Sequence, residues 1–284
     1  MYRITRHLKA FVGAVLLTMS MTSCIYDKYN TAQFNISVTA TDNDGKTVSP
    51  YAMQGQHLYF FLNDRYVDEL SSDVAGYYHT SMGLGNEIKF VSVGSEDETA
   101  FRIYPPVAGD HIHNQYVEVV DYENIPPLYH GVVQMVEGSD NLVIEMKDLR
   151  CRSCVLVYNM INKYGADGVY KVTYHGLRKG ITYEGVTCGD MVEVSRNGNI
   201  REDKSWLSNE LISLPTAPEE SLTFTLWHDN VPVAVAEVDD EGNPMVLNAR
   251  DEKCFIITLY DHAQISVKVV PWEEIPIDYI INPV

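Results

Sequence analysis

Cys24 is the residue whose sequence context points most directly to a chemical reaction. Three basic residues, Arg3, Arg6 and Lys9, precede an apolar stretch over residues 11–21, and two small residues stand directly before the cysteine. The apolar stretch is about half as long as a membrane-spanning helix requires, and a basic segment followed by a short apolar one is typical of a secretion signal. We therefore expect the chain to be exported and the Cys24 thiol to be modified.

The segment that ends at Cys24 resembles the lipobox of bacterial lipoproteins, in which the thiol is lipidated and the cysteine becomes the first mature residue. Met21 stands where leucine is usual, and Ile25 stands where lipoproteins of the inner membrane commonly have aspartate. The resemblance implies a signal peptide over residues 1–23, palmitate on Cys24, and a surface-exposed location in the cell outer membrane. Two or more acyl chains hold a protein on a bilayer, since each buried methylene contributes about 0.8 kcal/mol. The alternative is a plain secretory peptide with Cys24 in a disulfide.

The charge of the mature chain limits its partners. Residues 24–284 carry 18 basic and 39 acidic side chains, a net charge of −21 with histidine neutral. Such a chain is repelled on average by nucleic acids and by anionic membrane surfaces. We expect no nucleic-acid partner, and membrane contact only through the N-terminal lipid.

Two segments have the residue types of metal ligands. His111 and His113 would point to the same side of a strand and could share an ion. However, no carboxylate or third ligand stands at a recognisable spacing, and the preceding Pro and Gly residues favour a loop. Asp42-Asn43-Asp44-Gly45 begins like a calcium loop but lacks the glutamate at the twelfth position, so we interpret it as a turn. We expect neither a metal ion nor a cofactor.

Four further cysteines follow. Cys151 and Cys154 have the spacing of a redox dithiol or of half a zinc site. No second pair completes a zinc site, and residues 155–158 predict a strand instead of the helix that a redox dithiol normally opens. An even number of cysteines in an oxidising compartment favours disulfides, with three pairings possible. Buried free thiols remain open for Cys188 and Cys254.

The sequence lacks the motifs of nucleophilic and phosphate-binding enzymes. It has no Gly-x-Ser-x-Gly, and Met82-Gly83-Leu84-Gly85 lacks the third glycine and the lysine of a phosphate loop. Adjacent Tyr-His pairs face opposite ways on a strand and cannot act together locally. We expect a protein that is not an enzyme, with no catalytic residues and no small-molecule substrate.

Strands must position these residues, because alternation of apolar and polar side chains recurs along the chain. Residues 34–40 alternate strictly, and residues 221–226 and 264–269 repeat the pattern. Eleven further strands are expected: 57–62, 66–70, 87–93, 116–120, 132–136, 142–146, 155–160, 169–174, 191–194, 231–238 and 254–260. One short helix is expected over residues 203–211.

Many short strands separated by turns indicate an all-β sandwich fold. The 261 mature residues exceed the usual size of one domain. A cluster of charges over residues 147–150 separates two series of strands. We therefore expect an N-terminal β-sandwich domain over residues 24–150 and a C-terminal one over residues 151–284.

The order of several segments is similar to that of the fimbrillin superfamily. These segments are the lipobox, Phe34-Asn35-Ile36-Ser37-Val38, the aromatic strand over 57–62 with its Asn63-Asp64 turn, Tyr129-His130-Gly131 and the Pro271-Trp272-Glu273-Glu274 segment. More narrowly, the chain resembles the minor, fimbrillin-A-associated anchor proteins of Bacteroidales type V pili. The resemblance implies two tandem transthyretin-like β-sandwich domains, with fimbrial subunits as partners.

Pilus subunits of that family are cut after an arginine in the N-terminal domain and polymerise by strand addition, which uses the unpaired backbone groups of a sheet edge. Between Cys24 and Asp64 this chain has no arginine, and Arg65 falls in an expected hairpin. The resemblance therefore implies an uncut lipoprotein that anchors or caps a fimbrial polymer.

The alternative is a surface glycan-binding lipoprotein. In that case exposed aromatic side chains such as Trp206, Trp227 and Trp272 would stack on sugars, whereas an anchor would bury them in its core.

Overall fold

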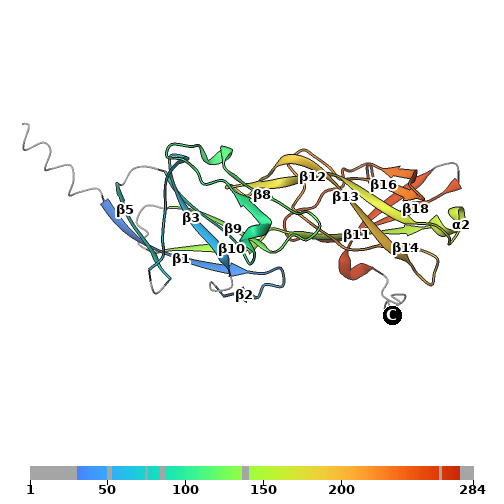
Figure 1. The fold of residues 1–284 in the computed structure, drawn as a ribbon, viewed down its shortest axis with the longest axis horizontal. Coiled ribbons are helices and arrows are strands. Elements are labelled where there is room, and N and C mark those ends of the chain that lie inside the picture. Colours follow the sequence, from blue (N-terminus) through green and yellow to red (C-terminus); the bar gives the residue numbers. More distant parts are fainter. Residues whose placement is uncertain are drawn as a thin grey trace, which may run out of the picture.

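The computed structural model describes residues 31–49, 53–73, 76–83, 87–135, 141–261 and 264–275. Cys24 and the expected signal peptide lie outside the described residues. The described chain is almost entirely β and forms two sheets that follow one another along the long axis of the molecule (Figure 1). Both sheets mix parallel and antiparallel pairs. The predicted all-β sandwich fold is confirmed.

The first sheet has eight strands, and its N-terminal strand pairs in parallel with its last one. Residues 35–41 of the first strand lie in register with residues 141–147 of the last. In spatial order the path is β2 (Thr47–Val48), β1 (Thr31–Thr41), β10 (Asn141–Asp148), β9 (Leu128–Gln134), β6 (Ile88–Ser95), β3 (Gln54–Leu62) and β4 (Arg65–Glu69), and β5 (Tyr78–Gly83) pairs with β1.

The second sheet has eleven strands. Its main path is β17 (Val231–Ala236), β16 (Thr223–His228), β12 (Tyr170–Thr182), β13 (Thr187–Ile200), β14 (Trp206–Ser208), β11 (Cys151–Tyr158), β18 (Glu252–Leu259) and β19 (Ile265–Pro271). Three short strands branch from this path, namely β15 (Leu211–Ser213), β7 (Phe101–Ile103) and β8 (Tyr116–Val119).

Helical segments are short. They are α2 (Met160–Tyr164) and the 3-10 helices η2 (Glu98–Ala100), η3 (Ile112–Asn114) and η5 (Trp272–Glu274). None of the described helices is long and apolar enough to cross a membrane. The helix expected over residues 203–211 is wrong. Trp206 and Leu207 instead pair with both β11 and β13, so tertiary pairing overrides the local sequence.

Alternation of burial explains why these residues form strands. In β10 the side chains alternate strictly between exposed and buried, which is typical of a half-buried strand. The buried faces form two main hydrophobic cores. One lies within the first sheet around Phe60 and Phe90, and a larger one runs from Tyr59 and Phe61 into the second sheet. The continuous second core packs the two sheets against each other.

Two features join the sheets at what we call the junction, where β10 ends at Asp148 and β11 begins at Cys151. Only Leu149 and Arg150 connect the two strands. In addition, β8 comes from the first half of the sequence but pairs with residues 180–182 of β12. The division into domains at residue 150 remains a proposal. β7 and β8 precede residue 150 in the sequence but belong to the second sheet, so that sheet contains strands from both halves of the chain.

Candidate functional site

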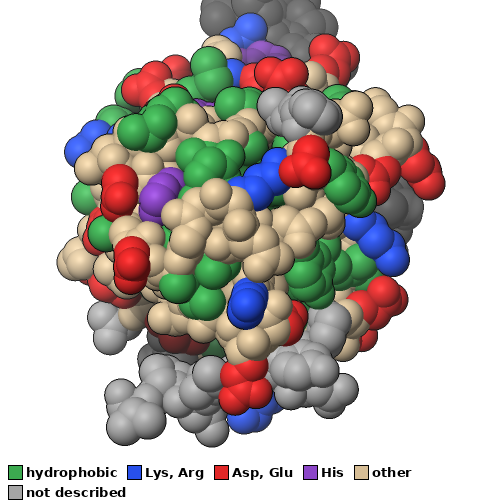
Figure 2. All heavy atoms as spheres, turned by 90° about the vertical axis from the view of Figure 1, so that its right-hand side faces the viewer, with side chains coloured by type: hydrophobic (Ala, Val, Ile, Leu, Met, Phe, Trp, Pro, Cys, Tyr) green, Lys and Arg blue, Asp and Glu red, His purple; other side chains and the backbone are tan. Residues whose placement is uncertain are grey.

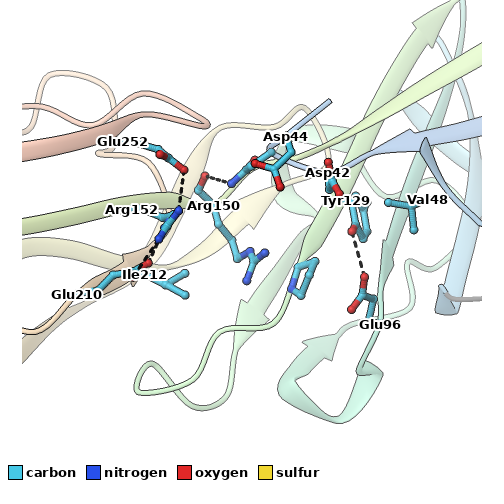
Figure 3. Close-up of a pocket in the computed structure, with 12 residues that line it drawn as sticks. Asp42, Asp44, Val48, Glu96, Tyr129, Arg150, Arg152, Glu210, Ile212 and Glu252 are labelled. Carbon is cyan, nitrogen blue, oxygen red and sulfur yellow. Dashed lines mark hydrogen bonds and ion pairs between the residues drawn. The ribbon is translucent and has the colours of Figure 1, made fainter. Parts of the chain in front are cut away.

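A cleft of about 430 Å³ opens at the junction (Figure 3). The turn between β1 and β2 forms one wall, and β11, β15 and β18 form the opposite wall. Asp42-Asn43-Asp44-Gly45 is this turn: the Asp42 N–H donates to the Lys46 carbonyl at 3.0 Å, and Gly45 has a φ of +76°. The cleft is lined by Asp42, Asn43, Asp44, Val48, Glu96, Pro127, Tyr129, Arg150, Arg152, Glu210, Ile212 and Glu252.

Three of the charged side chains of the cleft, Arg152, Glu210 and Glu252, are paired with one another. Arg152 donates from Nε to Glu210 Oε1 at 2.6 Å and from Nη1 to Glu252 Oε1 at 3.1 Å (Figure 3). The hydrogen bond to Glu210 is the main cause that raises the pKa of Arg152. Its guanidinium also lies 5.3 Å from the centre of the Trp272 ring. The Tyr129 hydroxyl donates to Glu96 at 3.2 Å, while burial raises the pKa of that phenol.

A buried ion pair lies behind the cleft. The Asp148 side chain is fully buried, and Arg150 donates to its two carboxylate oxygens at 2.7–3.1 Å. Arg150 also donates from Nη1 to the Ile125 carbonyl at 2.9 Å. From the second sheet, Arg250 donates to the Asp42 and Asn43 carbonyls at 2.9 and 3.1 Å. These contacts hold the segments on the two sides of the cleft together.

The edges of the two sheets are the places where another chain could pair. The outer edge of β4 is partly covered, because the Tyr66 N–H donates to the Asp110 carbonyl at 2.8 Å and the Gly109 N–H donates to the Tyr66 carbonyl at 2.9 Å. Charged side chains at Asp68 and Glu69 also protect this edge. A covered and charged edge is poorly suited to strand addition.

The edge formed by β17 is different in character. Within the described residues β17 pairs with β16 alone, and its sequence, Val-Pro-Val-Ala-Val-Ala, carries no charge. Val231 is 60% exposed and Val235 is 50% exposed. An exposed apolar edge strand is a template for pairing with another chain, and here Pro232 is the one position without a backbone N–H to donate. We call residues Val231–Ala236 the β17 edge.

The β17 edge starts at the end of the molecule that is formed by the second sheet. Loops meet there: the Asp229 N–H donates to the Val169 carbonyl at 3.0 Å, and the Tyr164 ring lies 5.8 Å from the His228 ring. Figure 2 shows this end, with apolar side chains over much of its middle and acidic ones mostly at its rim. The start of β1 lies at the opposite end of the molecule (Figure 1).

The cysteines do not form the disulfides that the sequence favoured, because Cys151, Cys154, Cys188 and Cys254 all carry free thiols. Cys151 and Cys154 face opposite sides of β11, as residues an odd number apart on a strand must. Burial raises the pKa of Cys151 to about 12. Cys154 lies beside Cys254 in the parallel pair of β11 and β18, and this contact together with burial raises its pKa. Because Cys151 and Cys154 point to opposite sides of β11, these two thiols do not form a redox dithiol or half a zinc site.

The three tryptophans are held by the fold. Trp206 is 1% exposed and packs in the larger core. Trp227 donates from Nε1 to the Thr173 hydroxyl at 2.9 Å, and the Lys171 ammonium lies 5.0 Å from its ring centre. Trp272 lies beside Arg152, so one face of each of the two half-buried rings, Trp227 and Trp272, already contacts a cation.

The structure brings one carboxylate to the two histidines that the sequence left without a third ligand. Single ligand atoms of Asp64, His111 and His113 all lie within 4.8 Å of one another. As predicted, the histidines lie in a loop, which contains η3. Sequence spacing could not reveal this cluster, because backbone contacts between β4 and residues 109–112 create it.

No family model matches the chain, and no curated protein sequence matches it. Solved structures do match. The fold is similar to that of the fimbrial anchor protein Mfa2 from Porphyromonas gingivalis, at 11% identity over 85% of this chain and 98% of that one, with a TM-score of 0.55. A candidate adhesin from Bacteroides ovatus matches at 14% identity over 85% of this chain and 95% of that one, with a TM-score of 0.54.

A candidate polysaccharide-binding protein from Bacteroides thetaiotaomicron matches at 11% identity over 84% of this chain and 98% of that one, with a TM-score of 0.54. At such low identities these likenesses establish the fold alone. They place the chain in the fold class that fimbrial anchors and adhesins of Bacteroidales share.

Proposed function

We propose that the protein is a non-enzymatic outer-membrane lipoprotein that anchors or caps a fimbrial polymer by β-strand addition. The observation that carries the proposal is the β17 edge, which is apolar, exposed and paired on one side only within the described residues. A fimbrial subunit could add a strand there through backbone hydrogen bonds, with alternate side chains contacting the exposed valines. The likeness in fold to a fimbrial anchor protein supports this reading.

The proposed polarity of the molecule suits an anchor. Cys24 is seven residues before Thr31, so an extended chain spans at most about 25 Å between the lipid and the start of β1. The lipid would hold the end formed by the first sheet near the bilayer. The β17 edge would then face away from the membrane, where a polymer could reach it.

Charge substitution at the β17 edge tests the docking step. Val235→Lys places a charge where a partner strand would lie, and we expect it to reduce capture of fimbrial subunits at least tenfold. Val143→Lys is the matched control, since Val143 is 53% exposed on the central strand β10. Equal capture by the wild type and both variants would show that strand addition does not occur at this edge.

Lipidation is tested separately. Cys24→Ala should abolish labelling with a palmitate analogue and move the protein from the membrane fraction to the soluble fraction. If the variant remained in the membrane fraction, anchoring through this thiol would be refuted whatever the result at the β17 edge.

Glycan binding is the second candidate function. The likeness to a candidate polysaccharide-binding protein favours it, and exposed tyrosines such as Tyr77 and Tyr260 could stack on sugars. The buried Trp206 and the cation-covered rings of Trp227 and Trp272 argue against it. A glycan array separates the two functions, because an anchor should show no saccharide preference.

A further inference from the structure

Three side chains with metal-binding chemistry converge between the two sheets. Asp64 belongs to the turn between β3 and β4, and His111 and His113 belong to the loop that leads into β8. Two imidazoles and one carboxylate form a ligand set that zinc uses in proteins, with water commonly in the fourth position. We propose that Asp64, His111 and His113 bind a Zn²⁺ ion.

The backbone holds the three ligands in place. Asn63 and Asp64 have φ values of +49° and +61°, which is the geometry of a tight two-residue hairpin turn. The Ile112 N–H donates to the Asp64 carbonyl at 2.8 Å, which ties the histidine loop to that turn. Ile112, which stands between the two histidines in the sequence, is fully buried. The loop is therefore fixed by packing and hydrogen bonds before any ion binds.

To coordinate zinc, the ligand atoms must move closer together and one imidazole must rotate out of its stack on the other, because a ring nitrogen binds a metal in the plane of its ring. With Zn–N and Zn–O bonds of about 2.0–2.2 Å, tetrahedral ligand atoms lie about 3.3 Å apart. The ligand atoms of this cluster already lie within 4.8 Å of one another, and the two imidazole rings stack with centroids 4.4 Å apart. Rotations about side-chain bonds close the difference. Asp64 and His111 are half-buried and His113 is exposed, so an ion and a water ligand can enter from solvent.

Glu184 acts as a positioning residue for His113. Its carboxylate contacts His113 Nδ1, which leaves Nε2 as the nitrogen that faces a metal ion. A carboxylate on the second nitrogen of a ligating histidine fixes the tautomer and makes the ligand more basic. Glu184 lies in the turn between β12 and β13, where the Tyr183 N–H donates to the Gln115 carbonyl at 3.0 Å. The ion would thus link a hairpin of the first sheet to a hairpin of the second.

The surrounding charges favour a divalent cation. Lys89 donates to Asp64 Oδ1 at 2.6 Å, so this carboxylate oxygen already has a partner. Asp64 Oδ2 therefore remains for the metal. Glu87 lies 3.3 Å from the same ammonium, so with Glu184 the cluster holds three carboxylates against two cations, Lys89 and Arg65, and Arg65 donates from Nη1 to the Gly109 carbonyl at 2.9 Å.

Zinc titration of the complete mature chain, with Cys24→Ser to keep it soluble, tests the proposal. We expect one Zn²⁺ per chain and, at zinc concentrations one-hundred-fold above Kd, a rise in Tm of about 5–10 °C. Asp64→Asn should weaken binding at least tenfold without disrupting the turn, because asparagine tolerates a positive φ. His113→Ala should do the same. His79→Ala is the control, since His79 is an exposed histidine that contacts Asp73 and Asn35 instead.

Glu184→Gln separates positioning from ligation. We expect about tenfold weaker zinc binding, while the visible spectrum of the Co²⁺-substituted protein keeps the bands of the wild type because the ligand atoms are unchanged. The proposal is overturned if zinc does not bind stoichiometrically, or if Asp64→Asn and His113→Ala bind zinc as tightly as His79→Ala.

Discussion

Replacing Arg150 should destabilise the protein far more than replacing an arginine of an exposed ion pair. In Arg150→Met the carboxylate of Asp148 keeps only the backbone N–H groups of Leu128 at 3.4 Å and of residue 150 at 3.1 Å. It loses three hydrogen bonds from the guanidinium while the side chain stays fully buried. Leaving a buried charge without its partner costs about 3–5 kcal/mol.

For a chain of this size that cost corresponds to a fall in Tm of roughly 6–20 °C. Urea unfolding of the mature chain at pH 7, followed by circular dichroism, measures the change in free energy. The control is Arg102→Met, because Arg102 pairs with Glu118 at 3.2 Å and its side chain is 57% exposed. That substitution should cost far less than Arg150→Met, because solvent screens an exposed ion pair.

The double variant Asp148→Asn with Arg150→Met removes the buried charge together with its partner. It should therefore recover part of the stability that the single variant loses. If Arg150→Met and Arg102→Met cost the same small amount, the buried pair does not stabilise the junction, and our reasoning about it is refuted.

Three further predictions concern buried groups. Burial lowers the pKa of His130, so at pH values below the unfolded pKa of about 6.5 the unfolded chain binds a proton that the native chain does not. As the pH falls through this range, the free energy of unfolding should decrease by up to about 1.4 kcal/mol per pH unit. His130→Gln should remove this contribution to the pH dependence when unfolding by urea is measured. A thiol reagent at pH 8 should modify only the half-buried Cys188 in the native protein but all four described thiols in denaturant; rapid native reaction of Cys154 would contradict its burial. Gly176→Ala should lower Tm by several degrees, because a Cβ there would lie 2.2 Å from the Ser221 carbonyl at a φ of +82°, and an unchanged Tm would contradict this contact.

The sequence predicted those strands and turns that local residue types determine, such as strands with apolar residues towards a buried face of the sheet. The strand expected over residues 142–146 is found as β10, and the turn expected over Asp42-Asn43-Asp44-Gly45 is found between β1 and β2. The long hairpin of β12 and β13 was recognised only in part. Its register shifts between Tyr174 and Leu177 and again between Arg178 and Gly180, which breaks the period of two that reveals a strand.

The contacts between distant segments could not be predicted from spacing. Asp64 reaches the two histidines because the edge of β4 pairs with the loop before η3, and nothing in the local sequence encodes that pairing. The sequence could not show that the cysteines are free for the same reason, because the pairing of the strands determines which thiols come close to one another. Cys24 and its expected lipid lie outside the described residues and remain a prediction.

The parallel pairing of β1 with β10 has a mechanical consequence. A load applied between Thr31 and the second sheet pulls β1 towards its start and β10 towards its end, so the two strands would slide along each other in shear. Rupture then requires the hydrogen bonds along seven paired positions to break together instead of one after another. Because forced unfolding depends on the rate of barrier crossing, this arrangement lengthens the lifetime of the folded tether under tension.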